Sequence, residues 1–238
     1  MNVRWHGRSP RRASRKDCLR KTGCGSRLGQ GASIPRRFQP ARWGSIFSVM
    51  RHKYETRGIV LSRSPLGEAN TFVTLLTPDL GLVRARAQGL RRPGAKLAAA
   101  LATFAESEIV LLRGKEHWRI AGAVLEENWF SRIQGAGPRV KAARACGLLL
   151  RLVAGEVQEP ALFSIMKGFF EALATLPEDV HDALEVLVVL YILAALGFDA
   201  ERVVNGAAVF TPELVAEVMK HRSRYIRRIN HGITASGL

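Results

Sequence analysis

Residues 54–96 contain three short segments that alternate in the two-residue pattern of β-strands, separated by turn residues. The alternation is clearest in residues 82–90, where small apolar residues alternate with Arg84, Arg86 and Gln88. Because successive strand residues point to opposite faces, the two arginines lie on the same side of the strand. This segment predicts a small β-structure with a positively charged face.

Two further segments extend the pattern, and turn residues such as Pro78 and Gly81 separate the strands. Strands are predicted at residues 53–63, 71–77, 82–90, 106–113 and 117–127, with a short helix at 97–101 between the third and the fourth. Five strands with an intervening helix are typical of an OB-fold barrel. Such barrels bind oligonucleotides through basic grooves and stacking aromatic side chains.

After Pro138 the apolar residues recur with the helical period of 3.6. Helices are predicted at residues 140–154, 160–176 and 179–196, followed by a last helix from Thr211 that turns Met219 and Ile226 inward and the arginines of 222–228 outward. The predicted class is α+β, with an N-terminal OB-fold β-barrel followed by an all-α helical domain. The predicted divisions are a disordered basic extension at 1–49, the barrel at 50–130 and the helical domain at 131–238.

The formal net charge of +16 is unevenly distributed, because residues 1–49 contribute +11 of it. This segment is rich in Arg, Gly, Ser and Pro, a composition typical of disorder. Three interpretations remain open: a basic arm that binds nucleic acid, an export signal with a twin arginine but no apolar segment after it, and a leader translated from a misplaced start, with Met50 as the first residue.

The three cysteines, Cys18, Cys24 and Cys146, form no CxxC pair and have no histidine at ligand spacing. We therefore expect no metal site, and Cys146 is expected to be a small buried residue. The motifs of P-loop, dinucleotide-binding, serine-hydrolase and zinc-protease sites do not occur. The chain is expected to be a cytoplasmic, nucleoid-associated protein without catalytic activity or cofactor.

The chain resembles the RecO family of recombination mediator proteins. The resemblance covers residues 51–200 and rests on the order and spacing of several short motifs. They are Tyr54–Leu61, Gly67–Asn70, Thr77–Leu82, Gln88–Arg92, Leu111–Gly114 and Trp118. Many members of this family carry a four-cysteine zinc module after the helix that corresponds to 179–196, and this chain has only a short linker at 199–210. The chain thus resembles a short form without the zinc-binding cysteines.

The resemblance implies a DNA repair and recombination mediator. It would bind single- and double-stranded DNA, anneal complementary strands, and load recombinase with RecR onto DNA coated by SSB, whose C-terminal tail would contact the helical domain. The predicted DNA-binding residues are Arg84, Arg86, Arg91, Arg92, Lys96, Arg113 and Lys115. Phe72 and Phe104 are expected in the core, and Trp118 is left open between core and surface. The alternative function is a non-enzymatic adaptor whose barrel docks a protein partner instead of DNA.

Overall fold

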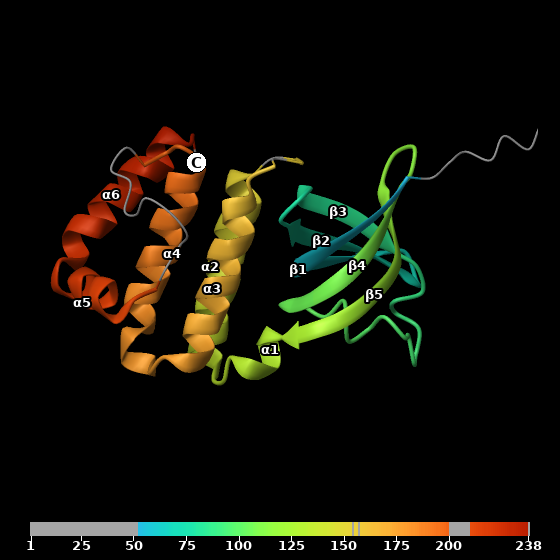
Figure 1. Ribbon diagram of the computed structural model, residues 1–238, viewed down its shortest axis with the longest axis horizontal. Helices are drawn as coiled ribbons and strands as arrows, with labels where there is room; N and C mark the ends of the chain where they lie inside the picture. Colours follow the sequence, from blue (N-terminus) through green and yellow to red (C-terminus); the bar gives the residue numbers. More distant parts are fainter. Residues whose placement is uncertain (1–51, 154, 157, 200–209, 238) are drawn as a thin grey trace, which may run out of the picture. The chain divides into compact units, whose positions relative to one another are not determined.

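The structure, a computed structural model, describes residues 52–153, 155–156, 158–199 and 210–237 (Figure 1). The predicted disordered extension at 1–49 lies outside the described residues. So do Cys18, Cys24 and most of the linker at 199–210.

Five β-strands come first along the chain: β1 (Lys53–Leu66), β2 (Asn70–Thr77), β3 (Gly81–Ala87), β4 (Ala105–Arg113) and β5 (Trp118–Asn128). They pair in the order β1-β2-β3-β5-β4, and β4 pairs with β1 again, so the ladder closes into a barrel. The pairings are antiparallel except for β3 with β5, which is parallel. A closed five-stranded ladder is consistent with the predicted OB-fold, and strands followed by helices confirm the α+β class.

The connection between β3 and β4 differs from the prediction. No helix forms at 97–101, because the hydrogen bonds there are a mixture of three- and four-residue turns, such as Ala98 N to Ala95 O and Leu101 N to Leu97 O. The connection ends at Phe104, which has a positive φ of 64°. This conformation is rare for an aromatic residue, and it is held by a hydrogen bond of 2.9 Å from Phe104 N to Val60 O.

The helices follow from Trp129 onward. They are α1 (Trp129–Arg132), α2 (Ala136–Leu152), α3 (Pro160–Thr175), α4 (His181–Ala195), α5 (Pro212–Lys220) and α6 (Arg222–Ala235), with one 3₁₀ turn at Glu178–Val180. The predicted single last helix is therefore wrong, since it breaks at His221, whose φ and ψ are −118° and 30°. Because of this break, Met219 and Ile226 are 50% and 38% exposed, although the sequence pattern placed them inward.

The apolar core consists of two clusters. One fills the barrel and includes Val60, Val73 and Leu75. The other contains the buried residues of α2, α3 and α4, and it also takes in Ile59, Leu61, Leu76 and Phe104 from the strands and the β3–β4 connection. Helix α3 contacts β2 and β3, and α4 contacts α2, α3, α5 and α6 (Figure 1). The division into domains at 130 stays a prediction.

A buried carboxylate joins the strands to the helices. Glu106 of β4 is 1% exposed, and it accepts hydrogen bonds from Lys167 Nζ of α3 at 2.7 Å and from Trp129 Nε1 of α1 at 3.2 Å. A charge removed from water to this extent requires a partner of opposite charge, and Lys167 supplies it.

Candidate nucleic-acid interface

The outer face of β2 and β3 carries two arginines, Arg84 and Arg86, that have no acidic partner among the described residues. Phe72 of β2 pairs with Arg86 of β3, and Thr74 pairs with Arg84. The intervening residues, such as Val73, face the barrel core. Arg84 is exposed and Arg86 is half-buried, as the alternation of residues 82–90 predicted.

Phe72 belongs to this outer face, and its predicted place in the core is wrong. The side chain is half-buried, the Arg84 guanidinium carbon lies 4.4 Å from the centre of its ring, and the His117 ring meets it edge-on at 5.4 Å. The sequence around Phe72 is apolar or β-branched on both sides, so alternation alone does not indicate its face. An aromatic ring beside a guanidinium on a strand face offers stacking and charge to a nucleic-acid base and its phosphate.

Arg119 of β5 also lies on this face, although it is not among the predicted DNA-binding residues. It pairs with Arg86 across the parallel β3–β5 ladder. Like charges directly opposite each other destabilise a sheet, and no acidic side chain of the described residues pairs with either arginine. In addition, the Arg86 Nε is buried without a hydrogen-bond partner there. An anion bound at this face would reduce the repulsion between the two guanidinium groups.

The β3–β4 connection contributes Arg91, Arg92 and Lys96, all exposed. Arg91 is positioned by the turn between β1 and β2, because its Nη1 donates to Gly67 O at 2.8 Å and its backbone N to Ala69 O at 3.3 Å. Arg92 and Lys96 have no acidic partner among the described residues. The connection thus carries three cations and places one of them, Arg91, beside the β1–β2 turn, one of the loops that flank the ligand face of an OB-fold.

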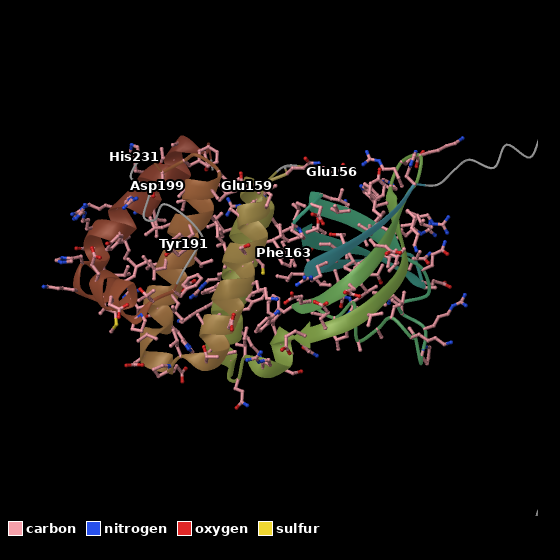
Figure 2. All side chains as sticks on the ribbon, viewed as in Figure 1. Glu156, Glu159, Phe163, Tyr191, Asp199 and His231 are labelled. Atoms are coloured by element: carbon pink, nitrogen blue, oxygen red, sulfur yellow. The ribbon has the colours of Figure 1, made fainter. Side chains whose placement is uncertain are left out.

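The two predicted DNA-binding residues of the β4–β5 hairpin, Lys115 and Arg113, differ in their contacts. Lys115 is exposed without an acidic partner in the described part of the chain. Arg113, in contrast, donates to Glu156 at 2.9 Å and lies over the Trp118 ring at 4.6 Å. Glu156 lies on the connection between α2 and α3, on the side of the helices that faces the strands (Figure 2).

Glu156 also accepts a hydrogen bond of 2.7 Å from Trp118 Nε1. This bond, and secondarily the Arg113 guanidinium, holds the pKa of Glu156 below its ordinary value. Trp118, left open by the sequence, is buried at 5% exposure. Of the seven predicted DNA-binding residues, Arg113 alone has an acidic partner within the described residues.

On the helices, unlike on the outer strand face, cations occur beside acidic side chains. Several of them form ion pairs with acidic side chains: Arg132 with Glu127, Lys141 and Arg222 with Asp182, Arg144 with Glu185, and Arg228 with Asp199. The guanidinium of Arg144 contacts Glu185 at 2.6 Å through both Nε and Nη2. Among the described residues, more cations lack an acidic partner on the strands and their connections than on the helices, and a polyanion would be attracted to such cations.

The described residues contain neither a metal-binding cluster nor a membrane-spanning helix. No group of three or more His, Cys, Asp or Glu side chains is placed to hold a metal ion. No helix in the described ranges is both long and apolar enough to cross a membrane. Cys146 is buried as expected, and burial raises the pKa of its thiol to about 12.

The comparisons with known proteins agree with this geometry. The sequence model of the family described as "Recombination protein O N terminal" matches residues 50–128. A DNA repair protein RecO of Dehalococcoides mccartyi is 30% identical over 122 residues, which cover 51% of this chain and 48% of the relative. The DNA repair protein RecO of Gloeobacter violaceus is 33% identical over 144 residues, or 57% of this chain and 54% of the relative.

The chain thus spans about half the length of the curated relatives it matches. The matched region of the family model begins just before β1 and ends with β5. It contains the outer face of β2 and β3, the β3–β4 connection and the β4–β5 hairpin. Residues 50–128 of this chain are therefore similar to the N-terminal domain of recombination protein O.

Proposed function

We propose that this chain is a non-catalytic mediator of DNA repair and recombination that binds DNA through its barrel. The observation that carries the proposal is the outer face of β2, β3 and β5, where Arg84, Arg86 and Arg119 lie together without an acidic partner among the described residues. Phe72 provides a ring on the same face. The similarity to proteins named DNA repair protein RecO supports a role in repair and recombination.

The proposed ligands are single- and double-stranded DNA. Single strands would contact the face through phosphates and through stacking on Phe72, whereas a duplex would contact it through phosphates alone. Strand annealing follows from the same surface, because a cationic face that holds two polyanions reduces their repulsion and raises their local concentration. Annealing of this kind requires no catalytic residue.

The proposed protein partners are RecR and the C-terminal tail of SSB, with which the chain would load recombinase onto SSB-coated DNA. The tail is assigned to the helical part. Helices α5 and α6 expose Met219 and Ile226 together with Arg222 and Arg227. Such a surface suits a peptide that carries both apolar and acidic side chains.

A salt titration of single-stranded DNA binding tests the proposal. It should be run on the full chain and on a chain shortened to begin at Met50, because residues 1–49 alone contribute a charge of +11. Each phosphate contact with a single strand adds about 0.7 to the slope of log K against log salt. Replacing Arg84 and Arg86 together by Gln should therefore reduce the slope by about 1.4, and replacing both by Glu should abolish binding.

The matched control reverses two cations of the helices, Lys220 and Arg227, which are exposed. The same change in net charge on α5 and α6, which lie on the far side of the helices from the strands (Figure 1), should leave the slope of log K against log salt almost unchanged in the shortened chain. An equal loss of DNA affinity in both double variants would mean that DNA binding depends on net charge and not on the outer strand face. If the shortened chain shows no DNA binding at low salt, the barrel docks another ligand, such as a protein partner.

A further inference from the structure

A cavity of about 330 Å³ lies beside the β1–β2 turn, separate from the outer strand face. We call it the barrel-end cavity, and its lining residues are Arg63, Pro65, Thr71, Arg91 and Thr103. Two of the five side chains are cationic, two carry hydroxyl groups, and none is acidic. This composition favours an anion over a neutral or cationic ligand.

Arg63 reaches this cavity because of an irregularity in β1. The pairing of β1 with β2 shifts between Val60 and Ser62, so that Leu61 is an extra residue. A bulge of this kind reverses which residues face inward beyond it. Arg63 is thereby placed opposite Val73, whose side chain faces the barrel core. Simple alternation from Val60 would instead have turned Arg63 outward, and Arg63 is not among the predicted DNA-binding residues.

Thr71 is the second unusual member of the lining. It lies two residues before Val73 on β2, and it pairs with Pro65 on one side and Ala87 on the other. The residue is 3% exposed, yet its Oγ1 has no hydrogen-bond partner among the described residues. Buried hydroxyl groups almost always have a partner. An oxygen atom of a bound anion would supply the acceptor that this hydroxyl lacks.

Arg91 completes the cationic side of the cavity. Its Nη1 donates to Gly67 O at 2.8 Å, which fixes the side chain beside the β1–β2 turn and leaves the remaining N–H groups of the guanidinium for a ligand. The Arg63 side chain is exposed and has no hydrogen bond or ion pair within the described ranges. Two guanidinium groups around one small cavity are the arrangement that binds a tetrahedral oxyanion through several charge-assisted hydrogen bonds.

We propose that the barrel-end cavity is a phosphate-binding subsite. Arg63 and Arg91 would contact the phosphate oxygens, and the Thr71 hydroxyl would donate to one of them. Its assignment to a backbone phosphate of a DNA strand rests on the proposed function, whereas a free phosphate would share the same chemistry. The subsite extends the interface from the outer strand face around the β1–β2 turn.

Two measurements on the full chain test the subsite and distinguish the sources of phosphate. In the first, inorganic phosphate is titrated against sodium chloride of equal ionic strength, and the amide signals of the protein are followed by NMR. Saturable shifts are expected at Arg63, Thr71 and Arg91. These shifts should disappear in Arg63→Gln and Thr71→Val but persist in Arg57→Gln, which removes another exposed cation of β1 outside the cavity.

The second measurement is the salt dependence of binding to a single-stranded oligonucleotide. Arg63→Gln should reduce the slope of log K against log salt by about 0.7, the contribution of one phosphate contact, relative to Arg57→Gln. Thermal melting of Thr71→Val provides a check that the variant is folded. Removal of an unpaired buried hydroxyl should not lower its melting temperature.

The outcomes separate the subsite from the proposed function. Both expected results together support a phosphate subsite that DNA uses. DNA binding with the same slope in Arg63→Gln and Arg57→Gln overturns the subsite for DNA and leaves the outer strand face as the interface. Phosphate shifts at Thr71 in a protein that binds no DNA support the anion site but refute the proposed function. The absence of phosphate shifts together with an unchanged slope overturns the inference.

Discussion

Replacing Lys167 by Met removes the cation that neutralises Glu106, and it provides the sharpest test of how the strands are joined to the helices. The Glu106 side chain is 1% exposed and that of Lys167 is 38% exposed. Removal of one partner from a buried ion pair costs about 3–5 kcal/mol, because a charge is left without compensation. Since water reaches the Lys167 end of the pair, we expect a loss near the lower limit, about 3 kcal/mol of unfolding free energy.

The second variant of this test is Lys167→Met combined with Glu106→Gln. The amide oxygen of Gln still accepts the hydrogen bond from Trp129 Nε1, now 3.2 Å from the carboxylate, and no buried charge remains. We therefore expect the double variant to lie within about 1 kcal/mol of the parent chain. The stability of each variant is measured by urea unfolding followed by far-ultraviolet circular dichroism.

Lys141→Met is the matched control. Lys141 contacts Asp182 at 2.6 Å, but the Asp182 side chain is 56% exposed, so this pair should contribute less than about 1 kcal/mol. The reasoning is refuted if Lys167→Met is no less stable than Lys141→Met. It is also refuted if Glu106→Gln fails to restore the stability of Lys167→Met.

Three further expectations concern single residues. Because the pKa of Glu156 is lowered in the folded chain, its contact with Trp118 should be complete above pH about 4.5 and lost as the pH falls through the lowered pKa. The NMR signal of the Trp118 indole N–H measures the loss of this contact. A signal that shifts only above pH 6 would contradict the expectation. Cys146, whose thiol pKa is raised to about 12, should resist maleimide at pH 8 in the folded chain and react with it in urea. Labelling is measured by peptide mass. Rapid labelling of Cys146 in the folded chain would disprove its burial. Gly232→Ala should lower the free energy of unfolding by about 1 kcal/mol, because the added Cβ would lie 3.1 Å from a backbone carbonyl oxygen. Gly147→Ala, with open space around it, should raise the free energy of unfolding by about 0.5–1 kcal/mol. Urea unfolding compares the two variants, and an equal change in unfolding free energy would show that the contact at Gly232 is relieved without cost.

The sequence predicted those parts of the fold that depend on short-range periodicity. The exposure of Arg84 and the burial of its neighbours followed from strand alternation, and the burial of Cys146 followed from its small apolar side chain. Phe72 was misplaced because its neighbours on both sides are also strand formers, so the local pattern contains no information on which face is inside. The break at His221 was missed because the apolar residues on either side of it suggest one continuous stripe.

The remaining features depend on contacts between residues that are distant in the sequence. Glu106 and Lys167 are 61 positions apart, and no local pattern indicates that they form a pair. Arg113 was predicted to contact DNA, and its partner Glu156 comes from the connection between two helices, 43 positions later. The direction of Arg63 depends on a bulge in β1, which simple alternation does not predict because it assumes an unbroken register.

The apolar cluster shared by strands and helices has a consequence for how the protein can be dissected. The family boundary at 128 divides this cluster, so a fragment that ends there would leave Ile59, Leu61, Leu76 and Phe104 without their helical neighbours. Such a fragment would expose a contiguous apolar patch and the Glu106 carboxylate at once, and it should aggregate instead of folding. Strands and helices are thus expected to unfold in one cooperative transition. A substitution deep in α3 or α4 can then abolish the cationic strand face without touching it.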